Sequence, residues 1–128
     1  MKDFVRCIAL AAFAAASLSI HAAEAWKPVK PVTIIVANAA GGTGDRTVRE
    51  IQRVAQAHKL IEVPIVIVNR PGGNGTIAMN QLAQSRGDAH VLLLISGANL
   101  SAHIAGLTPH THTDFTPISI IVDEYFGV

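Results

Sequence analysis

The stretch from Val32 to Asp45 constrains the fold most, because it joins an apolar run, a glycine loop and a helix start. Residues 32–36 are mostly β-branched and do not alternate with polar residues, which is typical of a strand covered on both faces. Residues 39–44 offer little beyond backbone. We expect Asp45 to cap a helix over Arg46–Leu60 and the loop to present N–H groups that can bind an anion.

This loop alone leaves a second interpretation open, since a glycine-rich connection is often only a tight turn. The pattern recurs, however. A second apolar strand over 64–69 leads through a glycine loop into a helix over Thr76–Ser85, and a third strand over 90–95 ends at Ser96 and Gly97. Helices between the strands predict a parallel sheet, and all three loops then share its carboxyl edge, where α/β proteins bind ligands.

The rest of the chain is less regular. We expect a short helix over Leu100–Gly106 and a fourth strand over Phe115–Val128. The sequence stops directly after this apolar run, which would need neighbouring strands to cover it. We therefore expect the 128 residues to be a fragment of a larger protein.

The first 25 residues have the form of a secretory signal peptide. Lys2 and Arg6 precede an apolar run over 7–20, and Ala23 and Ala25 form a small-residue cleavage site. The run is shorter than the roughly 20 residues of a membrane-spanning helix. We expect export to the periplasm, no stable membrane anchor after cleavage, and one domain over 26–128.

Composition excludes several classes of function. Cys7 is the only cysteine and lies in the expected signal, so no disulfide framework or thiolate metal site is expected. The net charge is +1 and aromatic residues make up 5%, so neither a nucleic acid nor an anionic membrane surface is an expected partner.

The candidates for catalysis and cofactor binding are weak. Ser96, Ser101 and His103 lack a nucleophile elbow, and His110 with His112 lacks a third metal ligand. Residues 73–78 fit the dinucleotide pattern Gly-x-Gly-x-x-Ala, but the acidic residue that should end the next strand is missing, because Asp88 precedes that strand. We therefore predict no enzyme and no cofactor. An exported hydrolase or a nucleotide-binding α/β enzyme stays the alternative.

Arg70 is the charged side chain beside the second loop. It can pair with a ligand carboxylate, or it can have a structural role, which the neighbouring Pro71 favours.

Four segments together resemble one family. They are Trp26-Lys27-Pro28 with Pro31, the first loop over 39–45, Val68-Asn69-Arg70-Pro71-Gly72-Gly73-Asn74-Gly75, and Asp114-Phe115-Thr116-Pro117-Ile118. Their order and spacing resemble the Bug family of periplasmic solute receptors of tripartite tricarboxylate transporters. The resemblance covers essentially all of residues 26–128.

The resemblance implies a Venus-flytrap receptor that closes two lobes on a small carboxylate, such as a di- or tricarboxylate or an acidic amino acid, and passes it to membrane transporter subunits. This chain would supply part of the first lobe, an α/β domain with a mostly parallel sheet and flanking helices, and would lack the second lobe. Without that lobe, a ligand would bind weakly at best. The ligand-binding residues that it implies are Ala40, Gly41, Gly42, Thr43, Gly44, Asp45, Gly73, Asn74, Gly75, Ser96 and Gly97.

The first loop departs from the commoner family pattern. It reads Gly-Gly-Thr-Gly-Asp, whereas the third glycine usually precedes the threonine, so the set of N–H groups that face the ligand can differ. Asn38 stands where an aromatic residue is frequent, and residues 87–90 replace the usual Gly-Tyr segment before the third strand.

Overall fold

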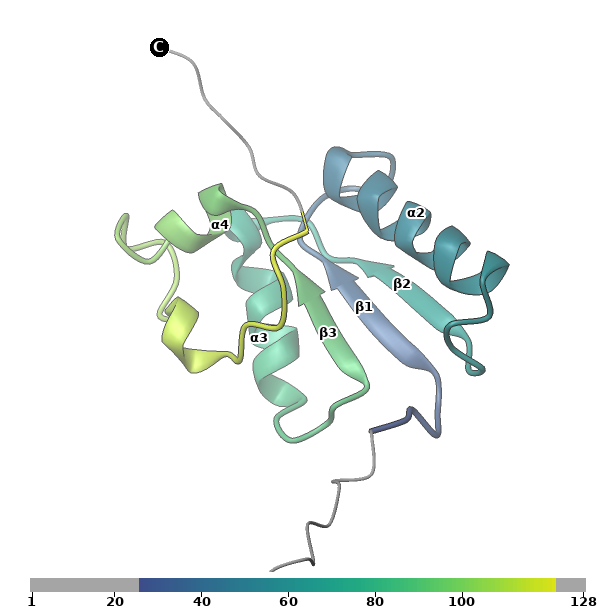
Figure 1. Cartoon of the computed structure of the whole chain (residues 1–128). Coiled ribbons are helices and arrows are strands. Elements are labelled where there is room, and N and C mark those ends of the chain that lie inside the picture. The colour runs from purple at the N-terminus through teal and green to yellow at the C-terminus, as the bar shows by residue number, and fades with distance from the viewer. Residues whose placement is uncertain (1–25, 122–128) are drawn as a thin grey trace, which may run out of the picture.

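The computed structural model describes residues 26–121, so the expected signal peptide lies outside it. The described chain forms three layers around a parallel sheet (Figure 1). Strands β1 (Val32–Val36), β2 (Ile65–Asn69) and β3 (Val91–Leu94) lie in the order β2-β1-β3, and both strand pairs are parallel. The predicted α/β class and parallel sheet are confirmed.

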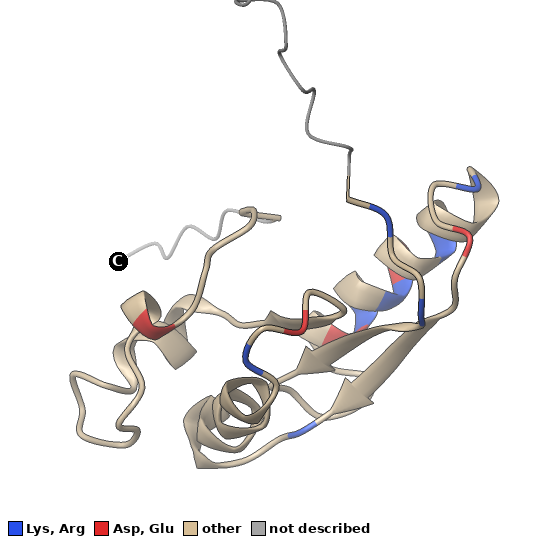
Figure 2. Cartoon of the chain, turned by 90° about the horizontal axis from the view of Figure 1, so that it is seen from below, with Lys and Arg blue, Asp and Glu red and all other residues tan. Residues whose placement is uncertain are grey.

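Strand β1 is the centre of the sheet because it has a partner strand on each side and a helix on each face. Helix α2 (Thr43–Ala57) covers one face, where Val36 and Val48 belong to one apolar cluster. Helix α3 (Thr76–Gln84) covers the other, where Ile35 and Ala78 are both 0% exposed. Figure 2 shows the two helices on opposite sides of the sheet. Strand β2 lies at one edge and is less covered, and its Val66 is 43% exposed.

The first helix begins earlier than the sequence predicted. Helix α2 starts at Thr43, and Gly42 is its N-cap, so the prediction that Asp45 caps this helix is wrong. Asp45 lies within the first turn, at the third helical position, where its charge still complements the positive end of the helix dipole. Its carboxylate folds back to the loop and accepts the N–H of Gly41 instead.

The region after β3 also differs from the prediction. The short helix is α4 (Gly97–Ser101), which starts before the expected Leu100 because Ser96 and Asn99 form a capping box there. A single 3-10 turn, η3 (His112–Asp114), follows, and another, η2 (Gly73–Gly75), precedes α3.

The fourth strand predicted over Phe115–Val128 is wrong for its described part. Residues 115–121 are in no strand, and residues 122–128 lie outside the described chain. Ile118 and Ile120 are 77% and 85% exposed, so they have no apolar layer to pack against. Pro117 in addition lacks the N–H that a ladder needs.

Candidate functional site

The three strands end at the same edge of the sheet, and all eleven predicted ligand-binding residues lie in the loops and first helical turns beyond it (Figure 1). Ala40–Asp45 follow β1, Gly73–Gly75 follow β2, and Ser96 and Gly97 follow β3. Asp45 and Gly75 are buried, whereas the other residues of this group are exposed or partly exposed. The chain topology therefore brings the predicted residues to one edge, as the sequence indicated.

Asp45 is the centre of a hydrogen-bond network in the first loop. Its Oδ2 accepts the Gly41 N–H at 2.8 Å and the Arg49 Nε–H at 2.8 Å, and its Oδ1 accepts from Asn69 Nδ2 at 3.0 Å. The side chain is 2% exposed. The hydrogen bond from Arg49, together with that from Gly41, lowers the pKa of Asp45 to about 2. The carboxylate is thus ionised, and its oxygens face protein donors rather than solvent.

The loop also uses its own amides. Gly41 donates to Asp45, and the N–H of Gly42 donates to the carbonyl of Ala39 at 3.0 Å. Among residues 26–121, the N–H groups of Thr43, Gly44 and Asp45 have no acceptor, and the N-cap Gly42 has no side chain to supply one. The donors without an acceptor are therefore those of the first turn of α2, where Thr43 and Gly44 are exposed or partly exposed and Asp45 is buried.

Gly44 lets this turn lie close to the end of β1. A Cβ at this position would lie 2.5 Å from Asn38 Oδ1 and 3.3 Å from a methyl group of Val36. Its backbone conformation is an ordinary helical one, so the requirement for glycine here is one of space.

The second and third loops are joined through Asn99, which is 6% exposed. Its Oδ1 accepts the Ser96 N–H at 2.9 Å and the Ser96 Oγ–H at 3.0 Å, and its Nδ2 donates to the Asn74 carbonyl at 3.0 Å. Gly75 packs directly on this amide, since a Cβ there would lie 2.6 Å from Asn99 Nδ2. Gly75 also has φ +90°, which favours glycine.

The first and second loops are joined through Asn69, the last residue of β2. Its Nδ2 donates to the Asn38 carbonyl at 3.1 Å as well as to Asp45. Sequence reasoning missed Asn69 and Asn99 as site residues. The available signal was an amide side chain at the end of a strand or the start of a helix, beside a glycine loop.

Other candidates from the sequence have local partners. Arg70 Nε donates to Gln81 Oε1 at 2.8 Å, which agrees with a structural role. Ser101 Oγ donates to the Ala98 carbonyl, and His103 Nδ1 lies 3.2 Å from the Thr108 carbonyl oxygen, so each contacts main chain. Within residues 26–121, no group of three or more His, Cys, Asp or Glu side chains could hold a metal ion.

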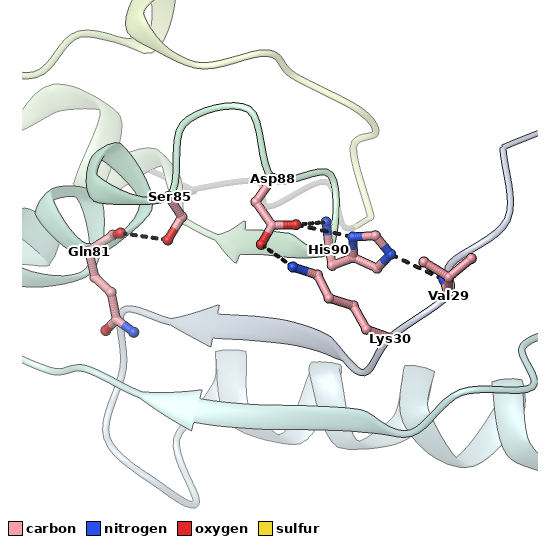
Figure 3. A network of polar contacts seen from close by, with 6 residues as sticks. All are labelled: Val29, Lys30, Gln81, Ser85, Asp88 and His90. Carbon is pink, nitrogen blue, oxygen red and sulfur yellow. Dashed lines mark hydrogen bonds and ion pairs between the residues drawn. The ribbon is translucent and has the colours of Figure 1, made fainter.

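A second polar cluster lies at the opposite, amino edge of the sheet (Figure 3). Lys30 Nζ contacts Asp88 Oδ2 at 2.8 Å, and His90 Nδ1 contacts Asp88 Oδ1 at 3.0 Å. The Val29 N–H donates to His90 Nε2 at 3.2 Å, so Nδ1 carries the imidazole proton that is donated to Asp88. This cluster connects the segment before β1 to the segment before β3.

An open hollow of about 530 Å³ lies beside this cluster and is lined by residues that include Trp26, Lys30, Arg86 and His90. The Trp26 and His90 rings lie with their centroids 5.4 Å apart. Lys30 and Asp88 are paired with each other, so their charges are largely compensated. None of the eleven predicted ligand-binding residues lines this hollow.

Charge is distributed unevenly over the two layers of helices. Helix α2 carries both basic and acidic residues along its exposed side, whereas α3 carries no charged residue (Figure 2). No helix within residues 26–121 is long and apolar enough to cross a bilayer.

Comparison with known proteins gives relatives of one kind. The chain is 31% identical over 100 residues to Protein BugT of Bordetella pertussis, an alignment that covers 75% of this chain and 30% of that protein. It is 32% identical over 125 residues to a UPF0065 protein of Bordetella pertussis, covering 94% and 38%, and 33% identical over 86 residues to a UPF0065 protein of Bordetella bronchiseptica, covering 66% and 25%. No protein-family model matches.

A solved structure has the same fold. The crystal structure of a TctC solute binding protein from Polaromonas, without ligand, superposes with a TM-score of 0.65 and 28% identity, over 71% of this chain and 31% of that one. The chain therefore spans only between 25% and 38% of the length of the relatives that it matches.

Proposed function

Because this chain is a Bug-family sequence over the stretch that it shares with these relatives, we propose that it is part of an extracytoplasmic receptor that captures a small carboxylate. In this proposal the receptor delivers its ligand unchanged to the membrane subunits of a tripartite tricarboxylate transporter. Residues 1–25 direct export to the periplasm, and residues 26–128 belong to the N-terminal lobe. The opposite wall of the cleft comes from sequence outside the matched third of the relatives.

The observation that carries the proposal is the set of open N–H groups at the start of α2, at the carboxyl edge of the sheet. Three consecutive amides there have no protein acceptor within the described chain, and two of them, those of Thr43 and Gly44, belong to residues that are not buried. Such amides, at the positive end of a 15-residue helix, favour a negatively charged group. A carboxylate can be held there by backbone and ordered water, without a buried lysine or arginine.

In the proposed site, the ligand carboxylate lies on the first turn of α2, and the second and third loops form the neighbouring wall. Gly73, Asn74 and Gly75 contribute backbone from the second loop, and Ser96 and Gly97 contribute from the third. The bonds of Asn69 and Asn99 support this arrangement, because they hold the loops in fixed positions before a ligand arrives.

Isothermal titration of the chain with succinate, citrate and glutamate, beside NAD as a dinucleotide control, tests the proposal. We expect a heat of binding for at least one carboxylate and none for NAD. Binding of NAD without any response to the carboxylates would contradict the proposal and favour the alternative of a nucleotide-binding α/β enzyme.

A further inference from the structure

The carboxylate of Asp45 lies inside the first loop and does not face the open side of the proposed site. Its side chain is 2% exposed, and its two oxygens accept three hydrogen bonds, from Gly41, Arg49 and Asn69. A ligand carboxylate on the open amides would gain nothing from a direct contact with this group, since two anions repel. Asp45 therefore acts through the residues that it contacts and not through the ligand.

Asp45 fixes the turn that precedes α2. Gly41 has φ +79°, and its N–H is directed at Asp45 Oδ2, while the N–H of Gly42 closes the turn onto the Ala39 carbonyl. With these two amides used, the donors left at this end of the helix are those of its first turn, of which Thr43 and Gly44 are the residues that are not buried. The carboxylate thus determines which amides of the loop are open to a ligand.

Arg49 compensates the charge that Asp45 brings to this end of the helix. Its Nε lies 2.8 Å from Asp45 Oδ2, one helical turn further along α2. An uncompensated carboxylate at this position would oppose the binding of a second anion, whereas the ion pair leaves the helix end attractive to one.

Asn69 connects this arrangement to the second loop. One amide group, Nδ2, donates to Asp45 Oδ1 at 3.0 Å and to the Asn38 carbonyl at 3.1 Å. Both of its hydrogens are therefore used, one on each flank of the first loop. Asn69 is followed directly by the loop that contains Gly73–Gly75.

We propose that Asp45 and Asn69 are positioning residues of the carboxylate site: Asn69 orients the Asp45 carboxylate, which sets the first loop so that the first-turn amides of α2 face the ligand. Neither side chain touches the ligand. The inference deepens the proposed function and rests on it, and it replaces direct ligand contact by Asp45, which the family resemblance implied, with an indirect role.

The test is a reversal of the donor and acceptor in this pair. Asn69→Asp places a second carboxylate against Asp45, so we expect succinate to bind about tenfold more weakly or worse, as for loss of at least one hydrogen bond. In the double variant Asp45→Asn with Asn69→Asp, the amide at position 45 donates to the carboxylate at position 69. We expect this variant to recover part of the lost affinity, because the bond between positions 45 and 69 is restored while the bond to the Asn38 carbonyl stays lost.

Asn80→Asp is the matched control, because it makes the same chemical change at an exposed position of α3. We expect it to bind succinate as the unchanged chain does. If Asn69→Asp does not fold, Asn69→Ala replaces it, since it removes both donors without adding a charge, and the expected loss is again about tenfold.

Hydrogen exchange of the Gly41 amide provides the readout without ligand. We expect faster exchange in Asn69→Asp and slower exchange again in the double variant. Unchanged succinate affinity in the Asn69 variants, or loss of affinity with no recovery in the double variant, would overturn the inference. If the unchanged chain binds no carboxylate, the proposed function fails, and the role of this pair in positioning a ligand site fails with it. The expected changes in Gly41 hydrogen exchange would in that case still show that Asp45 and Asn69 organise the loop.

Discussion

At the scale of single residues, Gly75 is where the site is least tolerant of change. It has φ +90°, and any Cβ would lie 2.6 Å from the buried amide of Asn99. We expect Gly75→Ala to lower the free energy of unfolding by about 2 kcal/mol through backbone strain and overpacking, and to weaken ligand binding by separating the second and third loops. Chemical denaturation and titration with succinate measure the two effects.

Gly97→Ala is the control for this prediction. It lies in the third loop of the same edge, but its φ is not positive and a Cβ there would meet nothing within 4 Å. We expect its free energy of unfolding to stay equal or to rise slightly, because alanine restricts the unfolded chain. Equal losses in the two variants would show that Gly75 is only an ordinary turn residue.

Asp45 shows what the sequence could and could not predict about the site at this scale. A carboxylate after a glycine loop predicted a helix start, and a helix does start there. The position of the cap was wrong by three residues, because the carboxylate bonds backward to Gly41 and not to an amide of its own helix. This bond depends on the positive φ of Gly41, and the carboxylate is also held by Asn69 from another strand, a contact that the local sequence does not encode.

At the scale of elements, strands and helices followed from apolar runs and their spacing. Residues 32–36, 64–69 and 90–95 were predicted as strands, and β1, β2 and β3 lie within those ranges. The same reasoning failed for residues 115–121, the described part of the predicted fourth strand, because an apolar β-branched run becomes a strand only where a partner edge and an apolar layer exist. Ile118 and Ile120 have neither among the described residues.

The cluster at the amino edge carries a prediction about acid stability. The hydrogen bond from Lys30, followed by that from the His90 backbone, lowers the pKa of Asp88 from 3.8 to about 2. Because folding lowers this pKa, the ionised Asp88 carboxylate stabilises the folded chain at pH values above the ordinary pKa of 3.8. This contribution is lost as the pH falls from about 4 to about 2. We expect Lys30→Ala to raise the pKa of Asp88 and so to reduce the loss of stability over this range.

Denaturation midpoints measured at several pH values between about 2 and 5 test this expectation. Lys27→Ala is the control, since it removes an equal charge from the same segment, and among residues 26–121 Lys27 forms no ion pair. Asp45 also titrates in this range, but it contributes equally to all three proteins. The same pH dependence in Lys30→Ala and in the unchanged chain would contradict the assigned cause.

At the scale of the whole molecule, the order β2-β1-β3 explains why three separate loops act together. In a parallel sheet of this order, the chain leaves β1 toward one face of the sheet and reaches β3 by way of the other face. The loops after β1 and β3 are therefore neighbours at the carboxyl edge, at the point where the strand order reverses. The repeated strand–loop–helix pattern predicted this edge. It could not predict the ligand, because backbone amides recognise a negative charge and not the rest of a molecule.

A carboxylate bound at the first turn of α2 would change the chemical shifts of the amides there, which nuclear magnetic resonance measures residue by residue. The full chain, labelled with nitrogen-15, is titrated with succinate. We predict that the largest shifts occur at the amides of Thr43 and Gly44, with smaller ones at Gly73–Gly75. Shifts confined to Lys30, Asp88 and His90 at the amino edge, or no shift in the first turn of α2 at saturating succinate, would contradict carboxylate binding at this helix start.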